Sequence, residues 1–192
     1  MSTLTTLPPH LQPRVQVELK VGETLVWVGQ PNPNRLMFAG FALWFFFIPW
    51  TAFSLFWMAG AAGFQMPTFD HAFSFFPLFG LPFLFIGLGG LSTPFWLHYK
   101  AQMTVYALTT QRALILEGGR SITVKTYPLA ELKHFERTER PDGSGDLIFK
   151  NETYRDSDGD RQNRKHGFFA IQNVRQVERQ LESLLQGGFA TF

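Results

Sequence analysis

The sequence predicts an α-helical membrane hairpin of two transmembrane helices, followed by a small, mainly β barrel that a C-terminal helix caps. Three observations lead to this prediction: two long segments without a charged side chain, a series of short strand-like runs after Tyr99, and one amphipathic helical pattern near the C-terminus. Of the 22 Phe residues, 16 lie between residues 36 and 97, and none of the 17 Lys and Arg residues does. The chain therefore joins a segment more apolar than a soluble core to flanks of ordinary polarity.

The first 35 residues precede the first apolar segment. Residues 1–14, MSTLTTLPPHLQPR, lack the apolar core of a signal peptide, and we expect them to form a disordered N-terminal tail. Residues 15–35 are expected to form a cytoplasmic lead-in to the first apolar segment. The pattern leaves open whether this lead-in pairs with the later strands.

Residues 36–62 and 72–97 are the two predicted spans. As a helix, the first would extend roughly 40 Å at about 1.5 Å per residue, which exceeds a bilayer core of about 30 Å. A pair of buried helices in a soluble protein is the alternative, but such helices normally keep a polar stripe, which both segments lack. Prolines predict kinks in the second span or a late start near Leu78, and they leave a re-entrant hairpin open; they are Pro49, Pro77, Pro82 and Pro94.

The positions of the basic residues predict the orientation in the membrane. Lys20 and Arg35 precede the first span, and Lys100 and Arg112 follow the second. The connector over residues 63–71 carries only Asp70 and His71 as ionisable residues. By the positive-inside rule both termini face the cytoplasm, and residues 63–71 form an extracytoplasmic loop.

Residues 98–192 change to the period of short β-strands. The runs MTVYALT, RALILEG, SITVKTY and LKHFERTE are rich in β-branched or aromatic residues, and polar or Gly-containing turns separate them. The pair Asp142-Gly143 is a strong turn signal before the next strands. A helix is predicted over residues 173–186, with an apolar face, Asn173 as a possible cap and Gly187 at its end.

Several segments together match one known pattern: YALTTQRALIL, TYPLAEL, the Gly-Asp-Leu of GSGDLIF, GFFAIQNVRQVERQL and, upstream, VGETLVWVGQPNP with its Gly-Glu and Trp-x-Gly-x-Pro. They resemble the bacterial pleckstrin-homology-type (PH-like) domain of small bacterial membrane proteins, from about Val15 to Leu185. The resemblance implies a PH-like split barrel with a C-terminal capping helix. It also implies a multi-pass protein of the bacterial cytoplasmic (inner) membrane, and it implies no reaction.

The resemblance also implies which residues define the fold. They are Tyr106, Thr109, Arg112, Gly145, Asp146, Gly167 and Phe168. Tyr106 and Leu108 are expected to point inward, Thr109 and Thr110 to make the turn, and Arg112 to open the next strand. Many relatives carry Asn or Asp in place of Thr110, and because Thr caps a turn more weakly, the geometry of this turn is an open point.

Basic residues are the predicted binding groups for lipid headgroups or an acidic partner. Eukaryotic PH domains that bind phosphoinositides place several Lys and Arg at the first strand-strand loop, where LTTQR offers Arg112 alone, which argues against a phosphoinositide site. The other candidates are Arg161, Arg164 and Lys165, at the tip of a predicted hairpin loop over residues 154–167. A merely solvated surface is the alternative.

The same loop has a weak resemblance to a calcium loop. Asp156, Asp158 and Asp160 alternate as calcium ligands do, but Arg161 stands where an EF-hand needs Gly, and Gly167 where it needs Glu. A long mobile hairpin is therefore favoured over a metal site.

No sequence motif predicts catalysis. The chain has no Cys, none of the metalloprotease, serine-hydrolase or phosphate-loop motifs, and five dispersed His residues. A zinc site at His134 and His166 would need ligands that the sequence does not indicate, so no cofactor is expected. Nucleic-acid binding is disfavoured because the aromatic residues are not interleaved with basic clusters.

The expected function is therefore that of a non-enzymatic integral membrane protein. Its PH-like domain is expected to bind a membrane-associated protein partner or a second copy of the chain, for example by strand addition at a sheet edge. Binding of anionic membrane lipids, and a role as an accessory subunit of a membrane enzyme or transporter, are the alternatives.

Overall fold

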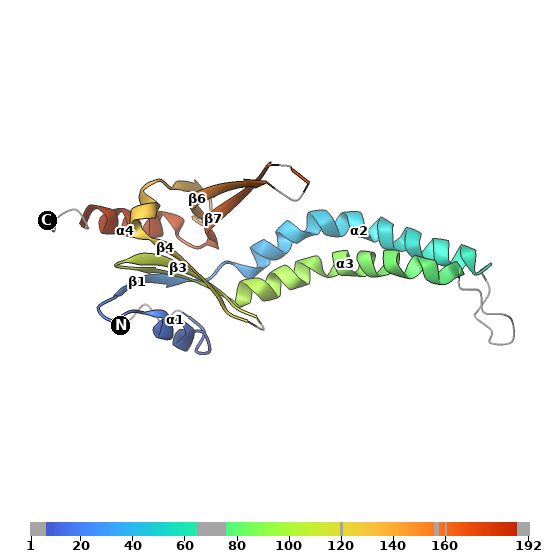
Figure 1. Cartoon of the computed structure of the whole chain (residues 1–192), viewed down its shortest axis with the longest axis horizontal. Coiled ribbons are helices and arrows are strands. Elements are labelled where there is room, and N and C mark those ends of the chain that lie inside the picture. Colours follow the sequence, from blue (N-terminus) through green and yellow to red (C-terminus); the bar gives the residue numbers. More distant parts are fainter. Residues whose placement is uncertain (1–6, 65–75, 120, 156–157, 160, 188–192) are drawn as a thin grey trace. The chain divides into compact units, whose positions relative to one another are not determined.

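The computed structural model describes residues 7–64, 76–119, 121–155, 158–159 and 161–187, without the side chains of Phe76 and Pro77. The chain divides into two compact units (Figure 1). The sheet unit comprises Met1–Pro33 and Lys100–Phe192, and the helical unit comprises Asn34–Tyr99. Two antiparallel sheets and two long apolar helices agree with the predicted class of helices plus a β domain.

The helical unit holds two helices that are long and apolar enough to cross a membrane. Helix α2 spans Pro33–Ala61, and helix α3 spans Leu81–Gln102 after the 3-10 turn η2, Phe76–Gly80. The second helix begins later than residue 72 and continues past residue 97. Pro82 fits this start, because a proline in the first helical turn costs no hydrogen bond. The helix continues through Pro94.

Helix α2 is followed by two residues with positive φ, Gly63 at 68° and Phe64 at 54°. The amide of Phe64 donates to the carbonyl oxygen of Ala59 at 2.8 Å, which satisfies a free carbonyl at the helix end. The rest of the predicted loop 63–71, with Asp70 and His71, lies outside the described residues.

Small residues allow α2 and α3 to pack closely. A Cβ atom on Gly87 would collide with Thr51, and one on Gly90 would collide with the ring of Phe47. The hydroxyl of Thr51 donates to the carbonyl oxygen of Phe47 at 2.7 Å, and that of Ser54 does the same to Trp50 at 2.9 Å. The buried hydroxyls of α2 are therefore satisfied within their own helix.

The sheet unit contains seven described strands in two antiparallel sheets. The first has the order β1-β2-β3-β4, with β1 Leu25–Gly29, β2 Thr104–Thr109, β3 Arg112–Glu117 and β4 Thr123–Pro128. The 3-10 turn η3, Leu129–Lys133, leads to the second sheet, β5-β6-β7, with β5 Glu136–Glu139, β6 Gly145–Arg155 and β7 Arg161–Ile171. Since β1 comes from the lead-in and pairs with β2, the lead-in is part of the β domain.

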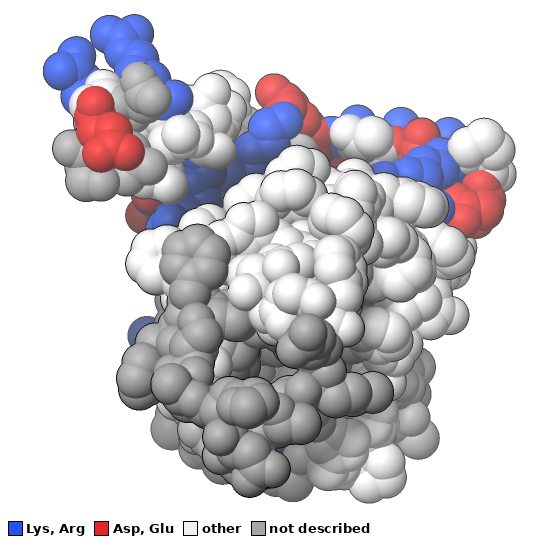
Figure 2. All heavy atoms as spheres, turned by 90° about the vertical axis from the view of Figure 1, so that its right-hand side faces the viewer, with Lys and Arg blue, Asp and Glu red and all other residues white. Residues whose placement is uncertain are grey.

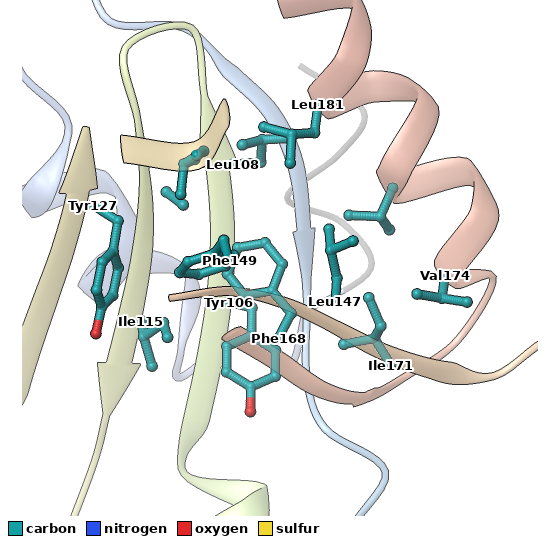
Figure 3. Packing of buried hydrophobic residues seen from close by; sticks show 13 residues of the cluster. Tyr106, Leu108, Ile115, Tyr127, Leu147, Phe149, Phe168, Ile171, Val174 and Leu181 are labelled. Atoms are coloured by element: carbon teal, nitrogen blue, oxygen red, sulfur yellow. The ribbon is translucent and has the colours of Figure 1, made fainter. Parts of the chain in front are cut away.

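The main core lies between the two sheets and helix α4, Val174–Gly187 (Figure 3). Phe168 occupies its centre, with its ring centroid 5.0 Å from that of Tyr106 and 5.3 Å from that of Phe149. Three apolar residues of α4 are buried against this cluster, namely Val174, Val177 and Leu181. The apolar face predicted for residues 173–186 therefore closes the core.

A second core covers the outer face of the first sheet. Leu7 and Leu11, which precede helix α1, Gln12–Glu18, and Val15 within it are buried against the outer faces of β2 and β3. This packing contradicts the predicted disordered tail for residues 7–14. The reason is that β2 and β3 are apolar on both faces, as is typical of strands covered on both sides, so the outer face needs a cover.

Candidate functional site

A buried ion pair joins the lead-in to the start of β3. The guanidinium of Arg112 donates from Nε to Oε1 of Glu23 at 2.8 Å and from Nη2 to Oε2 at 3.0 Å. The Glu23 side chain is 0% exposed and that of Arg112 is 12% exposed. Glu23 also accepts from the Thr109 hydroxyl at 2.6 Å and from the Lys20 amide at 2.8 Å. Arg112 further donates to the carbonyl oxygen of Glu18 at 2.7 Å.

These bonds stabilise the charged form of both partners. The hydrogen bond from Arg112, opposed by burial and assisted by the bond from Thr109, lowers the pKa of Glu23 from 4.5 to about 2. The bond to Glu23 likewise raises the pKa of Arg112. Since the Arg112 guanidinium is largely enclosed and already bound by Glu23 and the Glu18 carbonyl oxygen, it has a structural role, and its role in headgroup or partner binding stays a prediction.

The turn between β2 and β3 is built by the first of its two threonines. The hydroxyl oxygen of Thr109 accepts from the amides of Gln111 at 3.2 Å and Arg112 at 3.0 Å. Thr110 instead exchanges bonds with the lead-in, because its amide donates to the Thr24 carbonyl at 3.0 Å and its hydroxyl oxygen accepts from the Thr24 amide at 3.2 Å. The Asn or Asp expected at position 110 is therefore not needed to cap this turn.

The two motif glycines mark places where backbones meet. A Cβ atom on Gly145 would collide with the carbonyl oxygen of Thr138 on β5, and one on Gly167 would collide with the carbonyl oxygen of Leu147 on β6. Backbone cannot move aside as a side-chain tip can. Both positions therefore serve the fold of the second sheet.

Asp146 and Phe168 also have structural roles. Oδ1 of Asp146 accepts from the amide of Ala170 at 2.6 Å, and Ala170 adopts a positive φ of 52°. The carbonyl oxygen of Ala170 in turn accepts from the amide of Asn32 in the lead-in at 2.9 Å. Trp27 of β1 packs with its ring centroid 5.4 Å from that of Phe168. The lead-in is thus fastened to the second sheet as well as to the first.

The β6–β7 hairpin extends beyond the core as a two-stranded ribbon. Its register pairs Arg155 with Arg161 and Asn151 with Lys165, and residues 151–155 and 161–165 are all exposed. We call these ten positions the ribbon. Strand β5 pairs only with Gly145–Ile148 of β6, so the ribbon has no third strand along either edge within the described structure.

The strand register divides the predicted basic tip between the two faces of the ribbon. One face carries Arg161 and Lys165 together with Arg155, and its other members are neutral: Asn151, Thr153 and Asn163. Arg164 lies on the opposite face, where its guanidinium stacks over the ring of Tyr154 at 5.0 Å. Figure 2 shows blue and red side chains over the sheet unit, whereas the described surface of the helical unit on that face is white.

Arg155 and Tyr154 are surface residues that the sequence interpretation missed. The alternation of β-strand side chains would have placed Arg155 beside Arg161, once the turn was located between them. Arg155 thus brings the cations on the first face to three: Arg155, Arg161 and Lys165.

A polar contact fixes the base of the ribbon to the first sheet. The hydroxyl of Tyr127 on β4 lies 2.7 Å from Nδ1 of His166, and Nε2 of His166 lies 3.3 Å from a carboxylate oxygen of Glu152. Burial, followed by the charge of Glu152, raises the pKa of Tyr127. His134 lines a separate groove of about 580 Å³ that also includes Phe135. His166 therefore has a supporting role at the ribbon base.

Metal ligands are not grouped in the part of the chain that the structure describes, where no cluster of three or more His, Cys, Asp and Glu side chains is found. Of the three alternating aspartates, Asp156 and Asp160 lie outside the described residues, and Asp158 is exposed. The described structure therefore does not test the calcium-loop hypothesis.

Comparison of the chain with family models, curated proteins and solved structures found no match.

Proposed function

We propose that the protein is a non-enzymatic binding or assembly module of a bacterial cytoplasmic membrane. In this proposal, α2 and α3 form a transmembrane hairpin with both termini on the cytoplasmic side, and the sheet unit is a PH-like domain. The ribbon binds an extended segment of a membrane-associated protein or of a second copy of the chain.

The observation that carries the proposal is the ribbon itself. An isolated two-stranded hairpin is marginally stable in water and exposes unpaired N–H and C=O groups along both edges. Most of its side chains lie outside the core, so it adds little to the packing of the unit. An added strand would pair with these edges, and the exposed side chains would determine which strand fits.

A shortened ribbon tests the proposal. Residues 153–163 are replaced by Asn-Gly, which forms a tight turn between Glu152 and Arg164, two residues already paired across the hairpin. Tagged full-length protein and this variant are purified from native membranes in a gentle detergent, and co-eluting proteins and self-association are quantified by mass spectrometry. The proposal predicts a stoichiometric partner, or self-association, that the variant loses.

The control is a variant of the other sheet edge, Thr126→Arg on β4, which leaves the ribbon intact. A partner retained by both variants would show that the ribbon is not the binding surface. Loss in both would indicate a general defect rather than a local one.

Binding of anionic headgroups is the second candidate, favoured by the cationic face of the ribbon. It predicts that a thiol at Asn163→Cys, on the cationic face, reacts more slowly with a water-soluble maleimide in nanodiscs with phosphatidylglycerol than in pure phosphatidylcholine, and that salt removes the difference. Alanine at Arg155, Arg161 and Lys165 should abolish the difference. Equal rates in both lipids would exclude this function.

A further inference from the structure

The two chain segments that connect the sheet unit to the helices lie together at one end of the sheet unit. The side-chain amide of Gln30 donates to the carbonyl oxygen of Gln102 at 2.9 Å and to that of Thr104 at 3.3 Å. The chain leaves the sheet unit after Pro33 and re-enters it at Lys100. We call the part of the sheet unit around Gln30–Pro33 and residues 100–104 the connection end.

The turn between β3 and β4 lies at the same end. The amide of Gly118 donates to the carbonyl oxygen of Met103 at 2.9 Å. In the register, Thr104 pairs with Glu117, and Glu117 pairs with Thr123. The strand ends that flank this turn, Glu117 and Thr123, therefore lie next to the residue at which β2 begins, whatever the orientation of the unit.

The chemistry of this turn suits a membrane interface. Ile122 is 52% exposed, although it is a large aliphatic side chain. Two lysines share one carboxylate at the same end of the sheet, because Glu117 lies 2.6 Å from Nζ of Lys125 and 3.5 Å from Nζ of Lys100. Both lysine side chains are exposed by more than a third, at 37% and 42%. The group thus presents one apolar side chain and an excess positive charge.

The opposite end of the same sheet provides the contrast. Strand β2 is six residues long, or about 20 Å, and its far end carries the turn before Arg112. The segment that contains Val17 and Val21 lies there, since Arg112 binds Glu18 and Glu23. Val17 and Val21 are 82% and 104% exposed, so exposed apolar side chains exist at both ends.

We propose that the β3–β4 turn contacts the membrane in addition to the inserted helices. Ile122 enters the interfacial region of the leaflet next to the helix connection, and Lys100 and Lys125 face anionic headgroups. By sequence, Trp96 and Tyr99 precede the connection, as expected for residues at a bilayer interface. Because the Gly118–Met103 bond ties the turn to the connection, the turn cannot lie far from the headgroups once the helix is inserted. The contact would restrict rotation of the sheet unit about its two connections. The inference rests on the membrane insertion in the proposed function, but not on the ribbon or its partner.

The test places one fluorescent probe at each end of the sheet. The chain has no cysteine, so Ile122→Cys and Val21→Cys each give a single labelling site, and both positions are exposed. Each is labelled with an environment-sensitive nitrobenzoxadiazole probe in full-length protein in nanodiscs of phosphatidylcholine and phosphatidylglycerol. The expected result is blue-shifted emission and several-fold stronger quenching by headgroup-region nitroxide lipid at position 122 than at position 21.

Equal, water-like emission at the two positions would overturn the proposal. Alkaline carbonate extraction of native membranes distinguishes failure of the turn contact from failure of the proposed membrane insertion. A protein that resists extraction but shows a water-exposed probe at position 122 has an inserted hairpin without the turn contact. A protein that carbonate releases lacks the inserted hairpin itself, and both proposals then fail.

Discussion

Removal of the Glu23 charge should destabilise the sheet unit strongly at neutral pH. Glu23→Gln keeps the size of the side chain but replaces a charged acceptor of four described hydrogen bonds, two from Arg112, by an amide. The lowering of the pKa from 4.5 to about 2 corresponds to about 3 kcal/mol of stability at pH 7. A loss of this order also agrees with the roughly 3–5 kcal/mol for breaking a buried ion pair.

The pH dependence gives the sign of the effect. Because the folded pKa of Glu23 is lowered, its contribution is complete above about pH 5 and declines as the pH falls through 4.5 toward 2. The wild type should lose about 2 kcal/mol of this contribution between pH 7 and pH 3, whereas Glu23→Gln should lack that slope.

The assay is urea unfolding in detergent, followed by the reactivity of a single cysteine at the buried position Ala113. The exposed pair Arg175–Glu139 supplies the control, since Arg175→Gln should cost less than about 1 kcal/mol. The reasoning is refuted if Glu23→Gln unfolds within about 0.5 kcal/mol of the wild type at pH 7, or if the two show the same pH slope.

Three further substitutions test the packing. Gly145→Ala should destabilise the sheet unit by about 1–3 kcal/mol in the same urea assay because its Cβ meets the β5 backbone, while Gly119→Ala, which faces open space, should leave the midpoint unchanged. Phe168→Ala should cost about 3–5 kcal/mol, and a loss below about 1 kcal/mol would contradict its central place in the core. Gly90→Leu should separate α2 from α3 and lower the thermal stability of the helical unit in detergent, as measured by circular dichroism. Gly89→Leu, with open space at its Cβ, should not lower it. Equal effects of the two substitutions would refute the helix packing.

The two long apolar helices, α4 and most strands were accessible from sequence because each leaves a local pattern, whereas α1 was not predicted. The charge-free segments predicted two long apolar helices, and the apolar spacing of Val174, Val177 and Leu181 predicted the buried face of α4. The continuous apolar runs of β2 and β3 also held a signal for a cover on both faces, but that signal does not say which segment supplies the cover.

The contacts that were missed are long-range. Prolines interrupt the N-terminal segment, so no helical period revealed that Leu7 and Leu11 pack on the sheet. Glu23 and Arg112 are 89 residues apart, and no local pattern could pair them. The position of Arg155 on the cationic face depends on where the hairpin turns, and the sequence predicts the position of that turn poorly.

The most direct test of the account is a topology measurement on single-cysteine variants in intact cells. The cysteine-free chain allows one thiol in the connector, at Thr68, and one in the sheet unit, at Gln162, each probed with a membrane-impermeant maleimide. The account predicts labelling of Thr68→Cys in intact cells, and labelling of Gln162→Cys only after the cells are permeabilised. Labelling of both positions from outside, or of neither until permeabilisation, would contradict a hairpin that crosses the membrane twice and holds the sheet unit in the cytoplasm.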